Sequence, residues 1–149
     1  MSAATLLLLG AGGLAREVLA AMRRTQAYRI LGFLDDDAAL HSTMVDGLPV
    51  LGGLSDAADH PRCSFLACAG SGAARAGMVQ TLSRTGVAED RFATFVDPGA
   101  HLTEGCTVGA GSIIGEGSFI GDGVRIPADT KIAPNSSVES GAAVFAENL

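Results

Sequence analysis

The hydrophobic residues of this chain follow two patterns, one before and one after about residue 92. Residues 1–92 alternate short apolar runs with stretches of helical spacing, whereas from Val96 onward an aliphatic residue returns at every sixth position. A change of period along a chain indicates a change of fold. We therefore expect two domains, 1–92 and 93–149.

The first pattern predicts strands that alternate with helices. Strands are predicted at 5–9, 28–34 and 64–69 with a short edge strand at 47–53, and helices at 14–24 and 73–84 with one helical turn at 54–58. Such alternation is typical of a parallel sheet with right-handed crossovers. The fold class expected for residues 1–92 is a small Rossmann-like α/β unit.

The second pattern is a repeat of six residues. Its aliphatic positions are Val96, Leu102, Val108, Ile114, Ile120, Ile126, Ile132, Val138 and Val144. The residues four positions beyond them are nearly all small: Ala100, Cys106, Ser112, Ser118, Val124, Thr130, Ser136, Ala142 and Asn148. Neither a helix nor a two-faced sheet has a period of six, and an antiparallel sandwich would need a period of two. The repeat predicts a parallel β-helix of three coils, with the aliphatic ladder inside and 18 residues in each coil.

Composition narrows the function. With 149 residues, of which 48% are hydrophobic and 17% charged, the chain can bury a core. A net charge of −6 without a Lys/Arg cluster argues against nucleic acid and anionic membranes as partners. The run Leu6 to Leu9 is far shorter than the roughly 20 residues of a membrane span, so it is expected to be a buried strand. Three cysteines without a CxxC pair predict reduced thiols in the cytoplasm and no metal site.

Four segments carry a resemblance to a known family: residues 10–18, 32–37 and 46–52, and the hexads after Val96. In these segments the chain resembles sugar acetyltransferases of the NeuD/PglD type, which include sialic-acid O-acetyltransferases and N-acetyltransferases of nucleotide-linked amino sugars. The resemblance implies a Rossmann-like unit that holds a nucleotide-linked sugar and a left-handed β-helix that holds acetyl-CoA. It also implies acyl transfer in surface glycan biosynthesis and a homo-oligomer, by analogy a trimer.

The expected nucleotide-sugar site follows the strands of the first unit. Gly10, Gly12 and Gly13 precede a helix, whose N-terminal N–H groups and dipole suit a diphosphate. Asp35 and Asp36 can accept hydrogen bonds from ribose hydroxyls or base N–H groups, and Gly70, Ser71 and Arg75 would close the pocket from the next strand end. The alternative is that the turn is only a tight connection, because GAGG is not the full GxGxxG fingerprint. Many relatives have histidine where this chain has Leu14, so that contact is lost here.

At the position of the general base, this chain departs from the family that it resembles. The family places a histidine in a hexad that reads Val-Glu-His-Asp, and the matching hexad here holds Ser140 after Glu139. Serine cannot act as a base at neutral pH, and Glu139 is expected to be a solvated corner residue. His41, His60 and His101 are expected at the surface, His101 about two coils from Ser140.

The sequence stops at Leu149, at the end of the third coil, and 146–149 is too short to cap a β-helix. We therefore expect either another chain to pack on this end or the sequence to be a truncated product of a longer protein. Three functions stay open: an active sugar acetyltransferase, a non-catalytic module for nucleotide-sugar binding or oligomerisation, and a structural remnant without a ligand. The residues favour the second.

Overall fold

The computed structural model describes residues 4–144 and divides the chain into two compact units, Met1–Phe92 and Ala93–Leu149. Each unit has its own hydrophobic core and its own kind of sheet. The expected open end at 146–149, with the small-residue position Asn148, lies outside the described residues.

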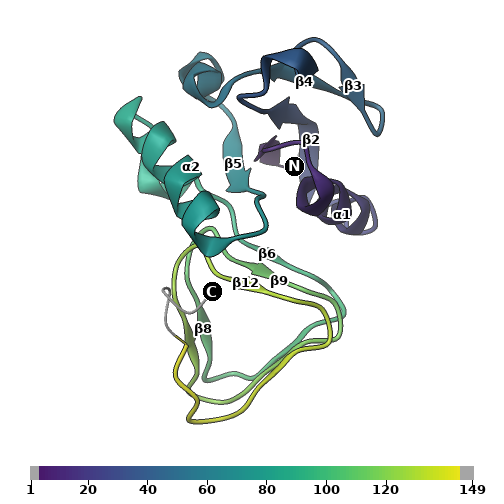
Figure 1. Cartoon of the computed structure of the whole chain (residues 1–149). Coiled ribbons are helices and arrows are strands. Elements are labelled where there is room, and N and C mark those ends of the chain that lie inside the picture. The colour runs from purple at the N-terminus through teal and green to yellow at the C-terminus, as the bar shows by residue number, and fades with distance from the viewer. Residues whose placement is uncertain (1–3, 145–149) are drawn as a thin grey trace. The chain divides into compact units, whose positions relative to one another are not determined.

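Five strands form the sheet of the first unit (Figure 1). They are β1 (Ala4–Leu9), β2 (Tyr28–Leu34), β3 (Met44–Val45), β4 (Leu48–Gly52) and β5 (Ser64–Ala67), in the order β3-β4-β2-β1-β5. β1, β2, β4 and β5 are parallel, and β3 pairs antiparallel with β4. The predicted edge position of the 47–53 strand is therefore wrong. Asp46 and Gly47 both have positive φ and form a tight turn that adds β3 outside β4.

Two α-helices complete this unit, α1 (Gly13–Met22) and α2 (Gly72–Arg84), with short 3₁₀ helices at Ala38–Leu40, Leu54–Asp59 and Glu89–Arg91. α1 buries Ala15, Val18, Leu19 and Met22. The interior strand β1 is buried along Leu6 to Leu9, as a strand between two parallel neighbours requires. The predicted strands at 5–9, 28–34 and 64–69 and the two predicted helices are confirmed to within two residues.

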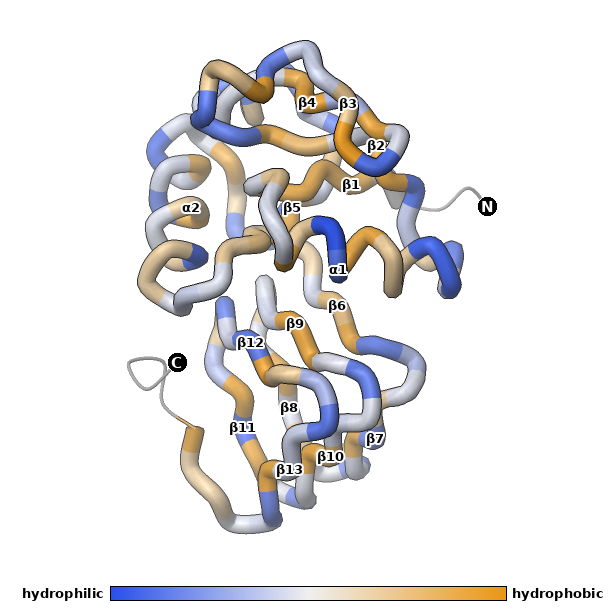
Figure 2. The backbone as a smooth tube through the Cα atoms, turned by 45° about the vertical axis from the view of Figure 1, so that its right-hand side comes forward, coloured by the Kyte–Doolittle hydropathy of each residue, from blue (hydrophilic) through white to orange (hydrophobic). Residues whose placement is uncertain are grey.

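The second unit is a three-sided parallel β-helix. Its two-residue strands are β6 (Phe95–Val96), β7 (His101–Leu102), β8 (Thr107–Val108), β9 (Ile113–Ile114), β10 (Phe119–Ile120), β11 (Arg125–Ile126), β12 (Lys131–Ile132) and β13 (Ser137–Val138). They pair in three sheets, β6-β9-β12, β7-β10-β13 and β8-β11, always with the strand 18 residues away. Figure 1 shows the triangular section, and Figure 2 shows the coils from the side.

The six-residue ladder lines the inside of this prism, as predicted. Ile114 and Ile120 are fully buried and pack with the other aliphatic ladder residues. The small positions have a role of their own: the Ser112 hydroxyl donates to the Pro127 carbonyl (2.9 Å) and accepts from the Thr130 N–H (3.1 Å). At this bend the serine hydroxyl pairs backbone groups of adjacent coils that would otherwise be buried without partners, and Ser118 does the same one corner further on.

Candidate functional site at the carboxyl edge of the sheet

The predicted ligand site lies where the chain leaves the parallel strands of the first unit. The Gly10 N–H donates to the Leu34 carbonyl (2.7 Å), and the Cys68 N–H donates to the Leu9 carbonyl (2.8 Å). These bonds continue the strand ladder into the loops, so the loops after β1, β2 and β5 meet at one edge. Ligands of open α/β sheets bind at this edge.

The three glycines of the first loop differ in what the fold requires of them. Gly10 is buried with φ of +91°, and a Cβ at this position would lie 2.9 Å from the Cys68 carbonyl oxygen. A Cβ at Gly12 or Gly13 would meet no atom within 4 Å, and both residues are exposed. Gly10 is therefore needed for the turn itself, whereas Gly12 and Gly13 leave open space that the fold does not need.

The N-terminus of α1 faces this space. Its N-cap, Gly12, makes no side-chain cap, and the first turn contains no acidic residue. The N–H groups of the first turn have no acceptor within a helix, so they and the positive end of the dipole suit an anion. Leu14, half-buried at the second helical position, offers no polar atom to a ligand.

The two predicted site carboxylates after β2, Asp35 and Asp36, already serve the fold. Asp35 accepts hydrogen bonds from the N–H groups of Ala11 (2.9 Å) and Asp37 (2.8 Å), and Asp36 accepts one from Leu54 (2.8 Å). Asp35 thereby ties the glycine turn to the end of β2. Each carboxylate oxygen has a second lone-pair site, so these bonds leave acceptor capacity for a ligand hydroxyl.

Hydrogen bonds from Arg75 hold the loop after β5 in place. This buried side chain donates from Nη1 to the carbonyls of Ala69 (2.8 Å) and Gly70 (3.3 Å), while the exposed Ser71 caps α2 by accepting from the Ala74 N–H (3.1 Å). Arg75 therefore shapes the loop on which Gly70 and Ser71 are presented.

His41 is a neighbour of this edge that the sequence did not indicate. It is half-buried, and its Nε2 lies 2.6 Å from the Asp35 carbonyl oxygen. His41 is therefore only partly exposed, and its ring is tied to the end of β2. The sequence gave no sign of this contact, because His41 and Asp35 are six positions apart in a segment without a regular hydrophobic pattern.

In the β-helix, Glu139 and Ser140 are exposed at the corner after β13. The Ser140 hydroxyl accepts a hydrogen bond from the Asp122 N–H (3.0 Å), and a Cβ at Gly121 would collide with the Ser140 backbone nitrogen. His101 is the one histidine in the sequence of this unit, and the register places it two coils from Ser137. It stacks on Phe119 with 5.4 Å between ring centroids.

The buried thiols do not add a nucleophile. Burial raises the pKa of Cys68 to about 12, against a smaller opposing effect of Arg75, and burial also raises the pKa of Cys63. Both stay protonated at neutral pH, and the thiolate is the reactive form. Within residues 4–144, no three His, Cys, Asp or Glu side chains gather so as to hold a metal ion. Nor does any helix in that range combine the length and apolar character needed to cross a bilayer.

A Rossmann-like unit followed by a left-handed hexapeptide β-helix is the architecture of the class that the NeuD/PglD resemblance predicts. The family model for the PglD N-terminal domain matches residues 5–82, and the model for the bacterial transferase hexapeptide (six repeats) matches 92–122. The chain belongs to the PglD N-terminal domain family, which confirms the resemblance.

Solved structures share this fold. The acetyltransferase domain of PglB from Neisseria gonorrhoeae, in complex with acetyl coenzyme A, has a TM-score of 0.71 and 17% identity, with coverage of 92% of this chain and 68% of that one. PerB from Caulobacter crescentus, in complex with CoA and GDP-perosamine, has a TM-score of 0.77 and 20% identity, with coverage of 91% and 62%. A comparison with curated proteins gives no match.

Proposed function

We propose that this chain binds a nucleotide-linked sugar at the carboxyl edge of its N-terminal sheet, as a member of the sugar acetyltransferase family. The observation that carries the proposal is the open space over Gly12 and Gly13 at the uncapped start of α1. Membership of the PglD N-terminal domain family supports it, and so does the fold shared with PerB, which was solved with GDP-perosamine.

Each residue of the site then has a role. The N–H groups of Gly13 and Leu14 receive the diphosphate, which gains from the helix dipole. Asp35 and Asp36 accept from ribose hydroxyls or the base, and Gly70 and Ser71 border the ligand from the loop that Arg75 holds.

We further propose that the chain, with Ser140 at the position of the base, binds its ligand without transferring acetyl groups. A serine hydroxyl does not take up a proton at neutral pH, and its Oγ is already an acceptor for Asp122 N–H. The alternative is an active transferase with acetyl-CoA as cosubstrate, which the shared fold of PglB and PerB favours. Trimeric assembly and a part in surface glycan synthesis rest on the family resemblance.

Calorimetry with two nucleotide sugars, UDP-N-acetylglucosamine and GDP-mannose, tests the binding site. Gly13→Leu places a side chain in the open space, because helical side chains lean toward the N-terminus. Gly77→Leu is the matched control: Gly77 is also helical and exposed, and a Cβ there also meets nothing within 4 Å. We expect binding of at least one sugar, lost in Gly13→Leu and kept in Gly77→Leu. No binding of either sugar, or equal binding by both variants, contradicts the proposal.

Thioester cleavage of acetyl-CoA with an amino-sugar acceptor separates the two alternatives. We expect no turnover by the wild-type chain and a gain in Ser140→His, with Ser137→His, three residues away on the outer face of β13, as the control. Wild-type turnover that Glu139→Gln or Ser140→Ala abolishes would show that the chain is an active transferase.

A further inference from the structure

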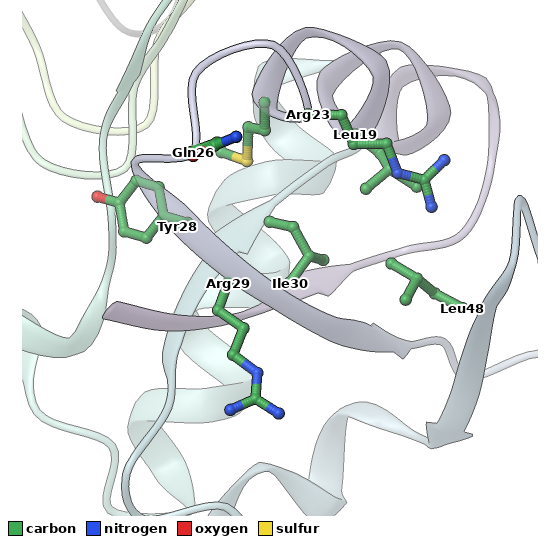
Figure 3. Close-up of a pocket in the computed structure, with 8 residues that line it drawn as sticks. Leu19, Arg23, Gln26, Tyr28, Arg29, Ile30 and Leu48 are labelled. Carbon is green, nitrogen blue, oxygen red and sulfur yellow. The ribbon is translucent and has the colours of Figure 1, made fainter. Parts of the chain in front are cut away.

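A hollow of about 480 Å³ lies in the first unit, away from the glycine turn (Figure 3). It is bordered by the end of α1, the beginning of β2 and the beginning of β4. The glycine turn lies beside the other end of β2, and seven strand residues span about 20 Å. The two places are therefore separate sites.

The hollow exists because β4 is shorter than its neighbour. On one side β2 pairs with β1 from its first residue, where Ala4 lies opposite Tyr28. On the other side the register with β4 begins at Phe33, opposite Val50. The first residues of β2 thus extend past the beginning of β4 and leave a notch beside the N-terminal part of β2.

Apolar side chains form the inner wall of this notch. Leu19 and Met22 of α1 are buried, and Ile30 and Leu48 are half-buried. Tyr28 stands at the margin, on the same strand as Ile30 (Figure 3). A wall of this kind suits the apolar body of a small molecule, and the volume is in the usual range of about 300–1,000 Å³ for ligand pockets.

Two arginines, Arg23 and Arg29, stand at the rim, and both are exposed. The carboxylate of Asp46 is bound by Arg16 (2.9 and 3.0 Å), whereas Arg23 donates to the Asp46 backbone carbonyl (2.6 Å). The carbonyl holds the guanidinium of Arg23 in place, and the nearby Asp46 carboxylate, which Arg16 also binds, offsets part of its charge. Arg29 has no such contact with Asp46 in the described part of the chain. In Figure 3 Arg23 lies on the helix side and Arg29 on the other side of the β2 ribbon, so an anionic group meets a cation at either margin.

We propose that this hollow is a second ligand site, which takes a small organic anion: an apolar ring seated against Leu19, Ile30 and Leu48, with a phosphate or carboxylate held by Arg23 or Arg29. Charge-assisted hydrogen bonds to guanidinium select the anion, and the apolar wall selects the ring. The site does not depend on nucleotide-sugar binding at the glycine turn.

The sequence provides a direct probe, because Tyr28 is the only tyrosine and there is no tryptophan. Protein labelled with 3-fluorotyrosine gives one ¹⁹F signal, from the hollow itself. We expect 1-naphthyl phosphate to shift this signal saturably, and 1-naphthol and inorganic phosphate, which each lack one half of the recognised ligand, to shift it far less. Absence of a saturable shift with 1-naphthyl phosphate overturns the proposal, and so does equal affinity for 1-naphthol.

Variants test the charge. Arg23→Gln combined with Arg29→Gln should weaken 1-naphthyl phosphate binding about tenfold, and Arg62→Gln, an exposed arginine outside the hollow, should leave it unchanged. Arg29→Gln alone is the safer variant, because the hydrogen bond of Arg23 to the Asp46 turn is then preserved. Circular dichroism checks the fold of each variant. Unchanged affinity in the double variant, or equal loss in Arg62→Gln, contradicts the assignment.

Discussion

Gly10 is the residue on which the candidate site most depends. Gly10 has a φ of +91°, and a Cβ placed there would lie 2.9 Å from the Cys68 carbonyl oxygen. Any side chain at this position would therefore be strained. We expect Gly10→Ala to lower the free energy of unfolding by about 1–3 kcal/mol, and Gly13→Ala, with open space and a helical backbone, to leave it equal or raise it by up to about 1 kcal/mol. Urea denaturation of both variants measures this difference. Equal stability of the two would show that the turn relaxes around a Cβ.

Cys68 makes stability depend on alkaline pH. Its pKa rises from the ordinary value of 9.0 to about 12 in the folded chain because of burial, so between these pH values the folded state keeps a proton that the unfolded state loses. Stability from this thiol is therefore complete below pH 9 and is lost as the pH rises toward 12, by at most about 1.4 kcal/mol per pH unit. We expect the unfolding free energy of the wild type to fall more steeply over this range than that of Cys68→Ala. Parallel curves contradict the prediction.

At the residue scale, the sequence indicated which side chains lie at the sheet edge but not what they bind. The bond from Ala11 to Asp35 joins residues 24 positions apart, and the bonds of Arg75 run to loop carbonyls. Such partners depend on strand register and loop path, which residue types alone do not specify. His41 was missed for the same reason, because its partner is a backbone carbonyl.

At the scale of elements, each two-residue strand of the β-helix has one residue that points inward and one that points outward, which allows a direct comparison in β10. In β10, Ile120 points inward and is fully buried, whereas Phe119 points outward and is 39% exposed. We expect Ile120→Ala to cost about 2–5 kcal/mol of unfolding free energy, because it leaves a cavity in the ladder. Phe119→Ala removes the stacking on His101 and less buried apolar surface than Ile120→Ala. We therefore expect it to lower the free energy of unfolding by about 1 kcal/mol. Chemical denaturation compares them, and a larger cost at Phe119 would show that the interior is not the ladder.

The predictability of an element follows its length and its period. Every strand of the β-helix could be predicted, because one aliphatic position in six fixes both the inward face and the pairing 18 residues away. β3 was missed, since two residues are too few to show a period. The Asp46-Gly47 pair was the available sign of this hairpin, because both positions need positive φ.

Over the whole molecule, the negative charge is concentrated in the β-helix. Residues 93–149 hold seven of the 16 acidic side chains but only two of the 10 basic ones, whereas residues 1–92 hold nine acidic and eight basic side chains. The net charge is therefore −5 in the second unit and −1 in the first. A surface of this sign repels the phosphates of coenzyme A, which the family resemblance places against the β-helix.

This charge distribution predicts an unusual salt dependence. Sites that bind phosphates through Lys and Arg weaken as salt is added, but here salt screens a repulsion, with a Debye length of about 10 Å at 0.1 M. We expect acetyl-CoA binding, measured by calorimetry, to be weak at low ionic strength and to tighten as sodium chloride is added. Binding of a nucleotide sugar by the nearly neutral first unit should change little.

Glu139→Gln with Asp122→Asn, both exposed beside Ser140, should tighten acetyl-CoA binding at low salt and reduce the salt dependence. Acetyl-CoA binding that weakens with added salt would instead place the coenzyme on cationic residues and contradict the prediction.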